Sequence, residues 1–123
     1  MRSKVALVAC GSYEDETVLR AMRTAINLLG GAGEFAREGE KILLKPNLLA
    51  ARSPDLAVTT HPAVFEAAAR VFAETGAVLS YGDSPGYESF RQAARKTGLA
   101  GRAEKTGVAE GDFETVVAAD FPG

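Results

Sequence analysis

The sequence predicts an α/β domain: a small, Rossmann-like parallel sheet in three layers, with helices on both faces. Short apolar runs alternate with segments whose apolar residues recur every three to four positions, in the order strand, helix, strand, helix, strand, helix. The first run is apolar throughout, which is typical of a strand covered on both faces. Since parallel strands are joined by right-handed crossovers, each helix is expected to return over the sheet.

The first predicted strand is residues 4–10, Lys-Val-Ala-Leu-Val-Ala-Cys, and Gly11 closes it. Ser12 is predicted to cap the following helix, with Asp15 three residues later in the position of a capping box. Acidic residues 14–16 then match the positive end of the helix dipole. We prefer this interpretation to a metal site, because adjacent residues on a helix point in different directions.

The first predicted helix carries an apolar stripe and ends at the glycine pair 30–31. Phe35 is expected to fold back into the core. The second predicted strand is residues 41–45, Lys-Ile-Leu-Leu-Lys, and Pro46 ends it because proline lacks a main-chain donor. The polar loop 47–59 is long for an α/β connection, which makes it a candidate binding loop or lid.

The second helix is predicted to begin at residues 60–62, Thr-His-Pro, with proline near the first helical position, and to end at residues 75–76. The rest of the chain is predicted to hold a strand, a helix, a helical turn and a fourth strand, at residues 77–81, 87–96, 102–105 and 113–117. The most apolar strand is the first, so we place it centrally and predict the order 2-1-3, with an open edge at the third strand.

The composition of the chain excludes several classes of function and of binding site. The chain has 123 residues, 46% of them hydrophobic and 24% charged, which suits one soluble domain. A net charge of -2 excludes a generally basic nucleic-acid binder. No apolar run approaches the roughly 18 residues of a membrane span, and no leader is visible, so a cytoplasmic location is expected. With one Cys and one His, neither an internal disulfide nor a closed metal or cluster site is expected.

Polar residues follow the predicted strands at their carboxyl ends, where open α/β sheets bind ligands. Cys10 ends the first strand, Lys45 and Asn47 follow the second, and Asp83 and Ser84 follow the third. This convergence predicts a crevice at one end of the sheet. The sequence contains no Gly-x-Gly-x-x-Gly or Walker A pattern, so no motif in it indicates binding of NAD or ATP.

Residues 82–86, Gly-Asp-Ser-Pro-Gly, are the sharpest local signal. Ser84 is predicted to cap a helix whose free N–H groups suit a phosphate or a carboxylate. Gly82 and Gly86 permit close approach of a ligand, and Asp83 is suited to orient a hydroxyl, bind a cation or act as a base. The alternative interpretation is a strand-to-helix turn built from good turn residues.

The other candidates lie on the same predicted rim. Lys45 is suited to hold an anion or, if desolvated, to form a Schiff base, and the alternative is a solvated lysine. His61 is the only histidine. It is suited to transfer protons, and the alternative is a hydrogen-bonded residue at the rim without a chemical role. Cys10 is expected to be buried or half-buried and unreactive. The candidate catalytic residues are therefore Lys45, Asp83 and His61, and the candidate ligand-binding residues are Asn47, Thr60, Gly82, Ser84, Gly86 and Cys10, with no metal ligand.

Four of these segments, residues 4–13, 42–48, 58–62 and 82–86, occur together in an order and spacing that resemble one protein family. Over residues 4–100 the chain is similar to the N-terminal part of the domain-of-unknown-function 362 family. The resemblance implies an iron–sulfur redox setting, because many members carry a ferredoxin-like segment with eight cysteines farther along. It thus implies 4Fe–4S clusters in a parent protein and none within this chain.

The chain departs from that family in its extent and in its cysteines. It ends at Gly123, where family members continue, so residues 1–123 are expected to be a single α/β domain that forms the N-terminal portion of a longer family domain. Two functions remain open. One is a half-domain that binds a small anionic molecule. The other is a non-catalytic scaffold whose sheet edge pairs with a second copy or with the missing C-terminal half, and whether the chain is an enzyme is also open.

Overall fold

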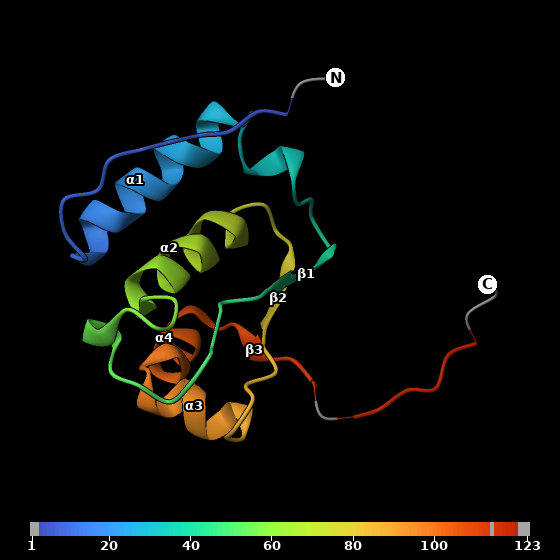
Figure 1. Ribbon diagram of the computed structural model, residues 1–123. Coiled ribbons are helices and arrows are strands. Elements are labelled where there is room, and N and C mark those ends of the chain that lie inside the picture. Colours follow the sequence, from blue (N-terminus) through green and yellow to red (C-terminus); the bar gives the residue numbers. More distant parts are fainter. Residues whose placement is uncertain (1–2, 114, 121–123) are drawn as a thin grey trace.

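A computed structural model describes residues 3–113 and 115–120, and Figure 1 shows a small parallel sheet with helices on one side of it. The strands are β1 (Lys41–Leu44), β2 (Val78–Tyr81) and β3 (Ala109–Glu110), in the order β1-β2-β3. The predicted α/β class and parallel sheet are confirmed. The predicted order 2-1-3 is wrong, because β1 pairs directly with β2, with Lys41 opposite Val78.

The N-terminal segment 4–10 is extended but forms no strand in the described part of the chain. It lies along α1 (Asp15–Leu28), outside the sheet (Figure 1). Its side chains alternate, since Ala6 and Val8 are half-buried while Val5 and Leu7 are 89% and 94% exposed. The apolar pattern therefore predicted the extended backbone correctly and its place in the sheet wrongly.

The helices do not cover both faces of the sheet. Helix α2 (Pro62–Ala73) packs on the sheet together with α3 (Phe90–Lys96) and α4 (Leu99–Thr106), and α1 packs on α2 instead of on a strand (Figure 1). The contact between α1 and α2 buries an apolar cluster that consists of Val18, Leu19, Ala63, Ala67 and Val71. Because α1 packs on α2, no helix of residues 3–113 and 115–120 covers the second face of the sheet (Figure 1).

Several element ends differ from the prediction. Helix α1 begins at Asp15 after Glu14, without a side-chain cap, and Ser12 only accepts from the N–H of Glu14 at 3.4 Å. Phe35 is 50% exposed and touches the ring of Phe72 edge-on, so it does not fill the core. The helical turn predicted at 102–105 is the full helix α4.

The C-terminal part also differs. A fourth strand was predicted at residues 113–117, but residues 113 and 115–117 are not in a strand, and residue 114 lies outside the described residues. The short strand β3 takes its place in the sheet, a few residues earlier in the chain. Two single turns of 3-10 helix complete the elements, η1 (Ala32–Glu34) and η2 (Pro54–Leu56). No helix in the described ranges combines the length and the apolar character that crossing a membrane requires.

The main core supports the carboxyl end of β2. The ring of Tyr81 lies between those of Phe65 and Phe90, with ring centres 5.2 and 5.3 Å away. Burial raises the pKa of Tyr81 above its ordinary value. Leu48 and Leu99 are fully buried in the same cluster, so the core also anchors the loop that follows β1.

A partly buried charge cluster joins helices α1, α2 and α4. The side chain of Glu66 is only 3% exposed. Its carboxylate pairs with Arg102 and with Lys105, whose Nζ lies 2.6 Å away. Arg102 also donates to Asp15 at 2.6 Å, which ties α1 to α4. Burial opposes ionisation of Glu66, but the two cations outweigh it and hold its pKa below the ordinary value. Asp15 and Glu16 of the predicted acidic helix start are thus engaged with bases, Glu16 with Arg70.

Candidate functional site

The loops after β1 and β2 enclose a cleft of about 390 Å³ at the carboxyl end of the sheet. The cleft brings together five of the residues predicted for the site, and apolar side chains complete its walls: Lys45, Asn47, Asp83, Ser84 and Gly86, with Leu48, Leu49, Val58 and Pro85. Both loops start where a parallel strand stops, so the five residues lie together at the edge of the sheet that the strand-end rule selects.

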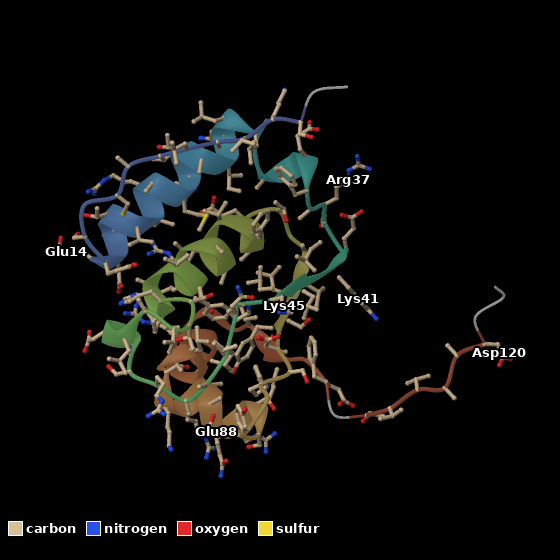
Figure 2. All side chains as sticks on the ribbon, in the orientation of Figure 1. Glu14, Arg37, Lys41, Lys45, Glu88 and Asp120 are labelled. Carbon is tan, nitrogen blue, oxygen red and sulfur yellow. The ribbon has the colours of Figure 1, made fainter. Side chains whose placement is uncertain are left out.

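The centre of the cleft is an ion pair between neighbouring strand ends. Lys45 Nζ lies 2.8 Å from Asp83 Oδ1, and the two side chains are 56% and 13% exposed. Asp83 Oδ2 accepts from the N–H of Leu48 at 2.8 Å. In Figure 2, Lys45 lies near the middle of the molecule, where the chain leaves β1. The carboxylate is therefore fixed, whereas the ammonium faces solvent.

Asp83 is held in its ionised form. Its burial opposes ionisation, but Lys45 and the main-chain N–H groups of Leu48 and Ser84 together outweigh burial and lower the pKa of Asp83 below its ordinary value. A carboxylate stabilised in this way is a strong hydrogen-bond acceptor and a weak proton acceptor near neutral pH. The geometry thus suits Asp83 to orienting other groups better than to taking a proton.

The loop 47–59, predicted as a binding loop or lid, is tied down at several points. Asn47 and Thr60 form a pair in which the N–H of Thr60 donates to the Asn47 carbonyl at 2.9 Å and the N–H of Asn47 donates to Thr60 Oγ1 at 3.0 Å. The N–H of Ala51 donates to Glu88 Oε2 at 2.9 Å. Sequence reasoning missed Glu88, because no local pattern signals a contact between two loops.

Ser84 does not cap a helix. Helix α3 begins at Phe90, and its cap is Ser89, whose Oγ accepts from the N–H of Gln92 at 3.3 Å. The prediction that Ser84 begins the helix is wrong, because residues 85–88 are irregular. The N–H of Ser84 is directed to Asp83 instead, so no helix N-terminus faces the cleft from this loop.

Gly82 is required by packing and does not line the cleft. A Cβ at Gly82 would lie 2.3 Å from the ring of Phe113, which covers this end of β2. The N–H of Gly82 continues the ladder by donating to the Leu44 carbonyl at 3.2 Å. Gly86, by contrast, lines the cleft, and a Cβ there would meet open space.

His61 lies at the first turn of α2, outside the residues that line the cleft. Its Nδ1 accepts from the N–H of Ala63 at 3.1 Å, so the ring serves as the N-cap and carries its proton on Nε2. The ring of Tyr13 stacks on it with centres 3.9 Å apart and planes 13° apart. This stack, which sequence reasoning missed, ties the segment before α1 to the start of α2.

Replacing His61 with alanine is expected to lower the free energy of unfolding by about 1 kcal/mol, because the N–H of Ala63 loses its capping acceptor. His61→Asn keeps a side-chain acceptor at this position and is expected to retain most of that stability. Urea unfolding monitored by circular dichroism measures both changes. Equal losses in the two variants would show that the Tyr13 stack, not the cap, is the contribution of His61.

Cys10 lies at a different groove. It is exposed, so the expected burial is wrong, and its Sγ donates to the Ser12 carbonyl at 3.2 Å. It lines an apolar groove of about 530 Å³ between the N-terminal segment and helices α1 and α2. This larger groove carries few polar groups, and the polar site residues lie in the smaller cleft.

No group of three or more His, Cys, Asp and Glu side chains is placed to hold a metal ion within the described ranges. A 4Fe–4S cluster takes four thiolates, and this sequence contains one cysteine. The residues of this chain therefore do not fit such a cluster.

Comparisons with known proteins bear on the same region. A family model described as a domain of unknown function (DUF362) matches residues 42–122, which include the whole cleft. The thylakoid-associated protein sll1697 of Synechocystis sp. is 39% identical over 98 residues. The alignment covers 80% of this chain and 30% of that relative, so the chain spans about a third of its length. No solved structure matches the chain.

Proposed function

The chain belongs to the family described as a domain of unknown function (DUF362), and we propose that its strand-end cleft binds a small anionic ligand. The observation that supports this most directly is the Lys45–Asp83 pair, whose charged groups lie 2.8 Å apart where two adjacent parallel strands end. An ammonium in this position attracts an anion, while the fixed carboxylate limits where the anion can lie.

Lys45 has unused capacity for a ligand. An ammonium has three N–H donors, and Asp83 occupies one of them. With 56% of its side chain exposed, Lys45 can direct the other donors to a carboxylate or phosphate oxygen in the cleft. Asn47 and Ser84, both exposed on the cleft wall, supply further polar groups for orientation.

Asp83 is a positioning residue in this proposal. It holds Lys45 in place and pins the loop after β1 through Leu48, and its lowered pKa disfavours a role as a base. His61 is occupied as a helix cap and is not among the residues that line the cleft. These contacts support ligand binding by the cleft, with Asp83 as a positioning residue.

A non-catalytic scaffold is the second candidate. Its support is that most of the motif residues already have a structural partner: Thr60 pairs with Asn47, Gly82 packs under Phe113, and His61 caps α2. On this alternative the cleft is only the place where two loops are joined. The two candidates differ in what Lys45 does, because this side chain is 56% exposed and its ammonium keeps donors free beyond the pair with Asp83.

Replacing Lys45 with alanine is expected to weaken anion binding at least tenfold, because no other lysine or arginine among the described residues lines the cleft. Inorganic phosphate and acetate are the probes, titrated at constant ionic strength with chloride as the reference ion. Two-dimensional NMR shifts of the loop amides at 47–49 and 84–86 measure the dissociation constants.

Lys41→Ala is the matched control, since Lys41 begins the strand that Lys45 follows, does not line the cleft, and points away from the helices (Figure 2). It is expected to bind both probes as the wild type does. Two results would favour the scaffold. In the first, phosphate and acetate shift the loop amides of the wild type no more than chloride does. In the second, Lys45→Ala binds both probes as tightly as Lys41→Ala.

Redox context and location are further parts of the proposal. The family resemblance supports an iron–sulfur redox setting, in which any 4Fe–4S cluster would take its ligands from outside this chain. We place the chain in the cytoplasm, on the basis of its composition. The relative's name connects that protein with thylakoids, so sedimentation of this chain with anionic vesicles is the measurement that decides between a free and a membrane-bound chain.

A further inference from the structure

A second polar cleft, here called the Tyr81 cleft, lies between α3, α4 and β3, on the side of the molecule away from α1 (Figure 1). Its volume of about 160 Å³ is below the roughly 300 Å³ at which pockets for drug-sized ligands begin. The cleft shares no lining residue with the strand-end cleft. Its lining combines one phenol, four charged side chains and four small apolar ones: Tyr81, Arg91, Arg95, Glu104 and Glu110, with Ala94, Ala100, Ala103 and Val108.

The hydroxyl of Tyr81 has no partner in the fold. Tyr81 is only 4% exposed, and its ring is held between those of Phe65 and Phe90. Among the described residues no group forms a hydrogen bond with this hydroxyl, although it is not sealed inside the core. The hydroxyl of a buried tyrosine normally has a hydrogen-bond partner. The cleft that Tyr81 lines is the space in which such a partner can lie.

Two observations show that this hydroxyl faces the charged rim of the cleft. Tyr81 is the register partner of Glu110 in β3, so the two side chains leave the sheet on the same face. Besides burial, which raises its pKa, the charges of Glu110, Glu104 and Arg91 act on the hydroxyl. All three of these residues line the cleft. The buried phenol and the exposed charges therefore belong to one site.

The rim offers one unpaired charge of each sign. Arg91 and Glu110 pair with each other, with nitrogen and oxygen 3.4 Å apart. Arg95 lies one turn after Arg91 on α3, and Glu104 lies on α4. Within residues 3–113 and 115–120, neither Arg95 nor Glu104 has an ion pair or a side-chain hydrogen bond. A simple anion would be attracted by Arg95 and repelled by two carboxylates, so a ligand that carries both charges is the better complement.

We propose that the Tyr81 cleft binds a small zwitterion, namely a free α-amino acid with a short side chain. The ligand's carboxylate accepts from the Arg95 guanidinium and from the Tyr81 hydroxyl, and its ammonium donates to Glu104. The alanine and valine side chains of the lining face the rest of the ligand, and the small volume restricts its side chain to a few atoms. The proposal is independent of any anion in the strand-end cleft.

Titration with alanine tests the charge class of the ligand. Acetate and methylammonium are the reference probes, because each carries only one of the two charges. Two-dimensional NMR shifts of the amides at 91–95, 100–104 and 110 measure the dissociation constants at neutral pH and constant ionic strength. Alanine is expected to bind at least about tenfold more tightly than either reference probe, since each of these lacks one charged hydrogen bond. Shifts that do not saturate with alanine, or acetate binding as tight as that of alanine, overturn the proposal.

Tyr81→Phe removes the hydroxyl and keeps the ring. Because the hydroxyl has no partner in the fold, the melting temperature of this variant is expected to equal or exceed that of the wild type. Its affinity for alanine is expected to fall at least about fivefold, through the loss of one hydrogen bond to a charged group. Unchanged alanine binding by this variant overturns the proposal, whatever its melting temperature.

Charge variants test the two ends of the ligand separately. Arg95→Ala is expected to weaken binding of alanine and acetate, and Glu104→Ala to weaken binding of alanine and methylammonium, each at least about tenfold for alanine. Lys96→Ala is the matched control, since Lys96 is an exposed cation next to Arg95 that does not line the cleft. It is expected to bind alanine as the wild type does. An equal loss in Lys96→Ala and Arg95→Ala would show a general effect of net charge and would overturn the proposed site.

Discussion

Replacing Glu66 with alanine is expected to lower the free energy of unfolding by about 2–3 kcal/mol. The side chain is 3% exposed and neutralises both Arg102 and Lys105, so its loss leaves two cations of α4 close together at a helix interface. The effect should fall short of that for a fully buried pair, because Arg102 keeps Asp15 and Lys105 is 58% exposed. Urea unfolding at neutral pH measures it.

Two further variants make this result specific. Glu66→Gln keeps the acceptor oxygen without the charge and is expected to lose less stability than Glu66→Ala. Glu16→Ala breaks the exposed pair with Arg70 and is expected to change the free energy by less than about 0.5 kcal/mol. A loss in Glu16→Ala equal to that in Glu66→Ala would contradict a role for burial in the cluster.

Replacing Asp83 with alanine is expected to lower the free energy of unfolding at pH 7 by about 2 kcal/mol, mainly because the N–H of the fully buried Leu48 loses its acceptor. The pKa of Asp83 is lowered from 3.8, so its stabilising contribution is present above that value and is lost as the pH falls through the folded-state pKa below it. The difference between wild type and variant should therefore shrink in acid.

Lys45→Met removes the ion pair of Asp83 and keeps its hydrogen bond with the N–H of Leu48, so the two contributions to stability can be measured separately. Because Lys45 is 56% exposed, its removal is expected to cost less than about 1 kcal/mol, although the anion affinity of the cleft should fall sharply. Urea unfolding at a series of pH values from 2.5 to 7 follows all three proteins. A difference between wild type and Asp83→Ala that stays constant down to the lowest pH would show that the Asp83 charge does not stabilise the fold.

Much of the site was predictable because it depends on one rule of topology. Parallel strands all end at one edge of the sheet, so the residues that follow each strand lie at that edge. The direct contact between Lys45 and Asp83 was not predictable, because the predicted order 2-1-3 puts the first strand between their two strands, whereas β1 and β2 are neighbours in the structure. The contact of Glu88 with Ala51 has no such rule behind it, because it depends on the shapes of two irregular loops.

The errors in the fold have a common physical cause. The run of residues 4–10 and the stripe of α1 indicate buried faces, but hydrophobic pattern does not specify which surface covers them. In the structure α2 presents an apolar surface to α1, so α1 does not cover the sheet and the N-terminal segment remains outside it. Similarly, Ser84 and Ser89 both suit a helix cap, and the irregular residues between them decide in favour of Ser89.

The pair between Asp15 and Arg102 joins positions 87 residues apart in the sequence. Closing a loop of that size is entropically unfavourable, and contacts within the unit formed by α2, β2, α3 and α4 close much shorter loops. We therefore expect this unit to fold first and α1 to dock afterwards, with the pair forming late. Substitutions at Asp15 should then mainly accelerate unfolding and leave the folding rate nearly unchanged.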